Sequence, residues 1–105
     1  MRIALVVALF LAGCGESVPV STSLSALSQA QMEFNGRNVI VRGTLRGFES
    51  PRHYWIENDS FDRVALQGVG NLAPWEDQTI EVRGTFLYDR EAGRRINVDE
   101  FVVSP

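Results

Sequence analysis

The sequence has no lysine, one cysteine and one histidine among its 105 residues, so all ten basic residues are arginine. A single cysteine excludes an intramolecular disulfide, and a single histidine excludes a histidine-rich metal site. Thirteen acidic residues give a formal net charge of −3, without the strong positive balance typical of nucleic-acid-binding domains. Hydrophobic residues make up 45% of the chain, which excludes wholesale disorder. The length predicts a single globular domain.

The sequence also lacks the motifs that enzymes and metal proteins carry. His53 is the one candidate general base, and no recognisable motif places a nucleophile near it. The segment 68–70 has two glycines but not the third that a phosphate-binding loop needs. The segment 58–62 resembles a calcium loop without its central glycine and closing glutamate. Adjacent carboxylates at 99–100 point to opposite faces of a strand. We therefore expect no enzymatic activity, no metal and no cofactor.

The longest hydrophobic run is short. Ten apolar residues, Ile3 to Ala12, follow Arg2 and precede small residues. At about 1.5 Å per residue, such a helix spans about half of a ~30 Å hydrocarbon core. A charged residue, a short apolar segment and small residues are typical of a secretory signal peptide.

The end of this segment, Leu11-Ala12-Gly13-Cys14, resembles the lipobox of bacterial lipoproteins. The resemblance implies a signal peptide over 1–13, cleavage before Cys14 and lipidation of that cysteine. The mature chain would have 105 − 13 = 92 residues, and the loss of Arg2 would give it a charge of 9 − 13 = −4. Gly15, in place of an aspartate, favours the outer membrane over the inner in enteric-type bacteria. The alternative is a buried helix with an incidental cysteine.

A tether and a short helix are expected next. Residues 14–23 comprise the lipidated cysteine and a segment rich in Gly, Pro, Ser and Thr, which predicts a flexible tether. Apolar residues then recur at Leu24, Leu27, Ala30 and Phe34, which predicts a helix that begins after Ser23 or Ser25 and ends at Asn35-Gly36.

From Asn38 onwards the apolar pattern has a period of two, which is typical of half-buried strands. A loop with room for one helical turn is expected over 68–77, where two glycines and a proline occur. The five predicted strands cover 38–46, 52–57, 62–67, 79–88 and 95–103.

The segment 39–45 (VIVRGTL) is echoed at 80–86 (IEVRGTF). A long strand that serves two faces of a small barrel must bend, and a glycine in mid-strand allows a bulge or kink. Gly43 and Gly84, in the first and fourth strands, therefore predict a closed five-stranded barrel.

The segment 34–43 (FNGRNVIVRG), the later IEVRG at 80–84 and INV at 96–98 resemble the OB-fold domains of small bacterial envelope proteins, over residues 24–103. The resemblance implies an all-β, five-stranded OB-fold-like barrel with a short N-terminal helix, in a domain over 24–105. The region between the third and fourth strands is short for the helix that many OB-folds place there. An SH3-like barrel is the nearest alternative.

OB-folds bind ligands across their second and third strands and the flanking loops. In this chain that region carries aromatic and arginine side chains, which stack on bases and also favour protein interfaces. The alternative is that the aromatic side chains fill the barrel and the arginines only keep it soluble. The candidate binding face is Arg42, Thr44, Arg46, Arg52, His53, Tyr54, Trp55 and Arg63.

These observations together predict a lipoprotein of the bacterial envelope, anchored to the membrane, facing the periplasm and acting as a non-catalytic binding or adaptor module. Its expected partner is an envelope protein or polymer. Binding of single-stranded nucleic acid is the alternative function, which export and negative charge disfavour.

Overall fold

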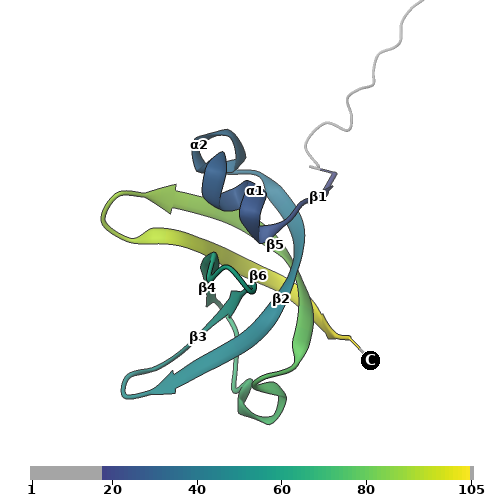
Figure 1. The fold of residues 1–105 in the computed structure, drawn as a ribbon, viewed down its shortest axis with the longest axis vertical. Helices are drawn as coiled ribbons and strands as arrows, with labels where there is room; N and C mark the ends of the chain where they lie inside the picture. The colour runs from purple at the N-terminus through teal and green to yellow at the C-terminus, as the bar shows by residue number, and fades with distance from the viewer. Residues whose placement is uncertain (1–17, 105) are drawn as a thin grey trace, which may run out of the picture.

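Five strands close into a barrel, as the period-two pattern predicts. The computed structural model describes residues 18–104, so the predicted signal peptide and Cys14 lie outside the described residues. The barrel strands are β2 (Asn38–Glu49), β3 (Arg52–Glu57), β4 (Arg63–Gln67), β5 (Thr79–Asp89) and β6 (Gly93–Val103), shown in Figure 1.

The order of the strands is that of a small OB-fold-like barrel. They are hydrogen-bonded in the order β2-β3-β4-β6-β5, and β5 pairs with β2 again, which closes the barrel. β4 and β6 run parallel, whereas the other barrel neighbours run antiparallel. The predicted fold class is therefore confirmed, and each predicted strand lies within about three residues of the observed one.

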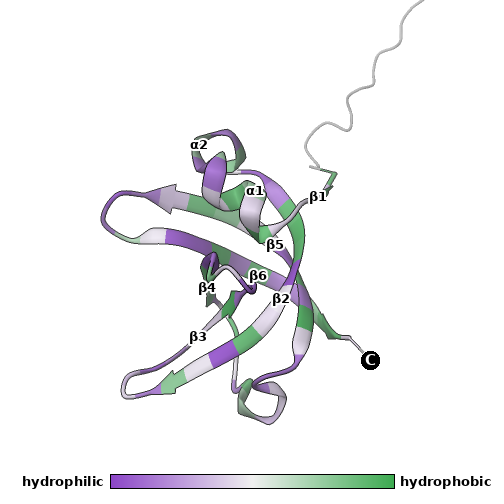
Figure 2. Cartoon of the chain, in the orientation of Figure 1, coloured by the Kyte–Doolittle hydropathy of each residue, from purple (hydrophilic) through white to green (hydrophobic). Residues whose placement is uncertain are grey.

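The core forms from the inward-facing side chains of the alternating strands. Val39, Val41 and Leu45 of β2 are buried, and so are Ile80, Val82 and Phe86 of β5. Hydrophobic and hydrophilic residues alternate visibly along β2 in Figure 2. The remaining core side chains, from the N-terminal helix, the other strands and the loop before β5, are Leu24, Leu27, Tyr54, Ile56, Val64, Leu66, Leu72 and Ile96.

The two mid-strand glycines lie where strands must approach closely. β2 pairs with β5 over its first half and with β3 over its second, and Gly43 lies at this change of partner. Gly84 lies at a register shift between β5 and β6, which confirms the predicted irregularity there. Both glycines lie outside the left-handed region, so space rather than special backbone angles explains them. The echoed segments lie side by side, and residues 39–43 pair antiparallel with residues 80–84.

The N-terminal region is more structured than the predicted tether and helix. Val20–Ser21 forms a short strand, β1, parallel to β2, so the predicted tether over 14–23 is wrong for these two residues. Ser23 caps helix α1 (Leu24–Gln29), and its side chain accepts a hydrogen bond from the Ala26 amide. The single predicted helix is interrupted at Ala30, whose backbone leaves the helical region, and continues as α2 (Gln31–Phe34).

The loop between β4 and β5 contains one turn of 3-10 helix, η2 (Ala73–Trp75), in agreement with the predicted single turn. Between residues 18 and 104, no helix is long and apolar enough to cross a membrane.

Candidate functional site

Alternation along β3 divides its side chains between the core and the outer surface of the barrel. Tyr54 and Ile56 point inward and are buried, and Tyr54 is only 4% exposed. His53 and Trp55 lie on the opposite face, where His53 is exposed and Trp55 is half-buried. The outer face of β2, β3 and β4 is therefore the surface on which β3 can present side chains to a partner.

Three aromatic side chains form a continuous row of tilted ring contacts on this outer face. Phe48 and His53 are cross-strand partners, and their ring centroids lie 5.8 Å apart. The His53 and Trp55 centroids lie 5.4 Å apart at an interplanar angle of 31°. The Arg63 guanidinium lies 5.2 Å from the centre of the Trp55 ring, within the range of a cation–π contact. We call Phe48, His53 and Trp55 the aromatic ladder; its end residue, Phe48, is 56% exposed.

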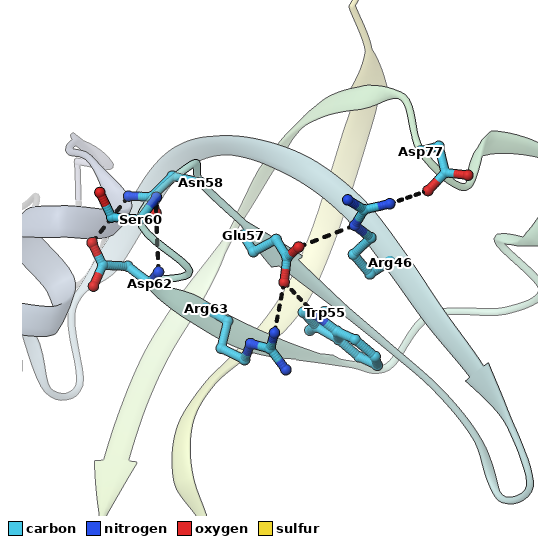
Figure 3. A network of polar contacts seen from close by, with 8 residues as sticks. All are labelled: Arg46, Trp55, Glu57, Asn58, Ser60, Asp62, Arg63 and Asp77. Atoms are coloured by element: carbon cyan, nitrogen blue, oxygen red, sulfur yellow. Dashed lines mark hydrogen bonds and ion pairs between the residues drawn. The ribbon is translucent and has the colours of Figure 1, made fainter.

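A nearly buried carboxylate, Glu57, organises the polar groups beside the ladder (Figure 3). Its Oε1 accepts hydrogen bonds from Trp55 Nε1 at 3.0 Å and from Arg63 Nη2 at 2.9 Å. Its Oε2 accepts one from Arg46 Nε at 3.0 Å. Arg46 also pairs with Asp77 through its Nη1. Glu57 thereby fixes the positions of Trp55 and both arginines, and we call these five residues the Glu57 cluster.

The charges of the Glu57 cluster balance one another. The pKa of Glu57 is lowered, most of all by the hydrogen bond from Trp55, and further by the hydrogen bond from Arg46 and the charge of Arg63. Burial of the carboxylate opposes this shift. The hydrogen bonds to Glu57 and Asp77 raise the pKa of Arg46. The guanidinium groups of Arg46 and Arg63 therefore face two carboxylates, which neutralise their charges beside the ladder.

An open cleft of about 410 Å³ adjoins the ladder. Arg94, at the start of β6, donates hydrogen bonds to the Arg63 carbonyl at 3.2 Å and to Gln31 Oε1 at 3.0 Å, which holds the β5–β6 hairpin against β4 and α2. The cleft thus lies where β3 and β4, the second and third strands of the barrel, face the β5–β6 hairpin. OB-folds bind ligands at this position. The cleft is lined by His53, Trp55, Arg63, Ala65, Tyr88, Gly93 and Arg94.

The structure brings together four of the predicted face residues, namely Arg46, His53, Trp55 and Arg63. Thr44 lies beside them on the same face of β2, opposite Glu57, and is half-buried.

The structure places the three other predicted residues away from this group. Tyr54 points into the core, because four consecutive residues of a strand cannot share one face. Arg52 follows the same alternation and donates from Nη1 to Tyr54 Oη at 2.9 Å and to Asn71 Oδ1 at 3.2 Å. Arg42 lies on the half of β2 that pairs with β5, where it donates to Ser104 Oγ at 2.9 Å.

Sequence reasoning missed four residues of the site: Phe48, Glu57, Tyr88 and Arg94. The period-two pattern extended over two more residues of β2 would have placed Phe48 on the same face as Arg46. The same alternation in β3 places Glu57 on the face of His53 and Trp55. Tyr88 and Arg94 depend on which strands lie side by side, which a local pattern does not show.

His53 is engaged with the backbone of its own turn. Its Nδ1 lies 2.7 Å from the Pro51 carbonyl oxygen, so Nδ1–H donates and the ring is held in place on the outer face. In the described part of the chain, three or more His, Cys, Asp or Glu side chains do not gather into a group that could hold a metal ion.

The chain was compared with models of protein families, none of which matches it, and with curated proteins, among which there is no match.

Proposed function

We propose that this chain is a non-catalytic binding module of the bacterial envelope, anchored by lipid on Cys14 and facing the periplasm, with the outer membrane favoured. Its partner, a protein or an envelope polymer, would bind the aromatic ladder and the adjoining cleft. The proposal assigns no role to a cofactor, and its mechanism is the presentation of a fixed aromatic surface at a short distance from the membrane.

The observation that carries this proposal is the exposure of the aromatic ladder. A small domain has few large apolar residues available for its core, yet Phe48 lies 56% exposed against His53. Hydrogen bonds fix His53 and Trp55, so a partner would meet the ladder with little further loss of conformational entropy. Clustered, ordered aromatic and arginine side chains are typical of interface hot spots.

Binding of single-stranded nucleic acid is the alternative function, and the Glu57 cluster disfavours it. Arg46 and Arg63 are paired with carboxylates, so a phosphate would have to compete with Glu57 and Asp77 for them. We therefore expect single-stranded DNA to bind weakly even in low salt, the condition that favours phosphate binding most. Tight binding that weakens steeply as salt is raised, the sign of phosphate neutralisation, would favour the alternative.

Membrane attachment rests on Leu11-Ala12-Gly13-Cys14 and is testable by one substitution. We expect Cys14→Ser to abolish incorporation of labelled palmitate and to leave the uncleaved precursor, because the sulfur that would carry the lipid is gone. Wild-type protein should float with membranes and show the mass of a chain cut before Cys14. Processed, labelled Cys14→Ser protein would contradict the lipoprotein proposal.

The binding face is tested by photo-crosslinking in intact cells. A photoreactive phenylalanine analogue at Phe48 should give a discrete adduct with a partner protein, or a series of adducts with a polymer. The same analogue at Val102, which is 59% exposed on β6 and outside the ladder, is the matched control. Equal adducts from both positions, or none from Phe48 in folded and acylated protein, would contradict the proposed face.

A further inference from the structure

Phe61 combines two unfavourable features in the loop between β3 and β4. Its backbone φ is +64°, in the left-handed region that costs most residues other than glycine, asparagine and aspartate about 1 kcal/mol or more. Its side chain is 68% exposed, so core packing does not compensate for this cost. Asparagine or glycine would suit the position better, which points to a role for the exposed ring.

The loop holds Phe61 in this conformation through the side chain of Asn58. Asn58 Oδ1 accepts hydrogen bonds from the amides of Ser60 at 2.9 Å and Asp62 at 3.0 Å. Asn58 Nδ2 donates to Asp62 Oδ2 at 3.0 Å, and the Phe61 amide donates to the Asn58 carbonyl at 3.0 Å. The side-chain contacts among Asn58, Ser60 and Asp62 are drawn in Figure 3. The ring is thus displayed from a rigid support.

This loop lies beside the segment through which the chain joins the barrel. Ser25, in the first turn of α1, donates to Asp62 Oδ2 at 3.2 Å. Asn58 lines a surface hollow together with residues 21–24, which link β1 to α1. Phe61 is therefore anchored next to the N-terminal connection, whereas Phe48 lies at the β2–β3 hairpin, which Figure 1 shows at the end away from α1 and α2.

The chain between Cys14 and this connection is short. Six residue steps separate Cys14 from Val20 of β1, and a chain spans at most ~3.6 Å per residue, so the two lie within about 22 Å. A lipid on Cys14 would hold the β1 side of the barrel close to the headgroups. The β3–β4 loop, next to that side, would then reach the interface.

We propose that Phe61 is a second, non-covalent contact between the barrel and the lipid surface to which Cys14 is anchored. The inference rests on the proposed lipidation. Aromatic rings partition favourably into the interfacial region of a bilayer. Asp59 and Asp62 flank Phe61, so the contact is apolar rather than electrostatic and is expected with zwitterionic lipids and at high salt. It would turn the aromatic ladder away from the membrane.

The test is NMR on the acylated mature protein in phosphatidylcholine nanodiscs, with a small fraction of the lipids carrying a gadolinium chelate on the headgroup. We expect the amide signals of residues 59–62 to lose most of their intensity, whereas those of the 49–52 turn keep theirs. Acylated protein in which both segments are broadened equally would overturn the inference and leave the proposed function intact. If the mature protein purified from membranes carried no acyl chains, both the inference and the proposed function would be overturned.

Substitution of Phe61 distinguishes contact of its ring with the lipid from mere proximity of the loop to the membrane. Phe61→Asn should fold with a melting temperature higher by a few degrees, because asparagine tolerates the left-handed backbone, yet lose the selective broadening. Phe48→Asn, the matched exposed phenylalanine, should leave the broadening of 59–62 unchanged. Selective broadening that persists in Phe61→Asn would show that the tether alone places the loop, and would overturn the role of Phe61.

Discussion

Gly84→Ala is expected to destabilise the barrel by about 3 kcal/mol or more, which is a large share of the stability of a small domain. A Cβ on Gly84 would overlap the backbone carbonyl oxygen of Asn97 and lie 2.9 Å from Ile96 Cγ2. The obstructing atom belongs to the backbone of β6, so a change of rotamer cannot relieve the overlap. Relief requires β5 and β6 to separate at their register shift.

Urea unfolding of the wild type and Gly84→Ala measures this effect. Gly70→Ala is the matched control, because a Cβ there meets nothing within 4 Å, and it should change the free energy of unfolding by about 0.5 kcal/mol or less. Gly43→Ala should fall between the two, because its Cβ would lie 2.8 Å from Cδ1 at the end of the Leu24 side chain and 3.0 Å from Ile56 Cβ. Equal midpoints for the wild type and Gly84→Ala would contradict the close approach of β5 and β6.

Glu57→Gln is expected to lower the free energy of unfolding by about 1–2 kcal/mol at pH 7. The amide oxygen can still accept hydrogen bonds, but the amide nitrogen cannot, and the charge that Trp55, Arg46 and Arg63 stabilise is lost. Both arginines are about half exposed, so water screens part of each interaction and keeps the effect moderate.

The loss of stability in Glu57→Gln is also expected to depend on pH. Because the pKa of Glu57 is lowered in the folded state, its contribution is fully present above the unfolded value near 4.5 and is lost as pH falls through the folded value. The difference in stability between wild type and Glu57→Gln should therefore shrink below pH 4.5.

Asp62 and Asp89 also have lowered pKa values, but they titrate in both proteins and cancel in this difference. Glu91→Gln, at an exposed turn residue, is the control and should match the wild type. A difference between wild type and Glu57→Gln that stays constant from pH 7 to pH 3 would contradict the charged role of Glu57.

Local patterns were sufficient to predict the barrel. The period-two alternation of apolar residues placed Val39, Val41, Leu45, Ile80, Val82 and Phe86 inside, because one face of each strand must be buried in so small a core. The same patterns could not predict β1, since a two-residue strand has no period of its own and exists because β2 offers a free edge there. Nor could they show that the backbone of Asn97 leaves no room for a Cβ at position 84, because Asn97 is distant from Gly84 in sequence.

The candidate site was predicted less completely. The predicted binding face grouped consecutive aromatic and arginine residues by their type. The alternation of side chains along β3 places Tyr54 and Arg52 on the face opposite to His53 and Trp55. Phe48 and Glu57 acquire their roles from strand pairing, which sets Phe48 opposite His53 and brings Arg46 and Arg63 to Glu57. Pairing register is a property of the closed barrel, and it determines which exposed side chains become neighbours.

The central claim, that the aromatic ladder binds the partner, is tested most directly by the dissociation constant of the partner recovered from the Phe48 crosslink. We expect His53→Ser to weaken binding about tenfold or more, because it removes the middle ring of the ladder. Val102→Ser should stay within about twofold, and the melting temperatures of both variants should lie within a few degrees of the wild type because both side chains are exposed. Equal dissociation constants for wild type and His53→Ser would contradict the claim.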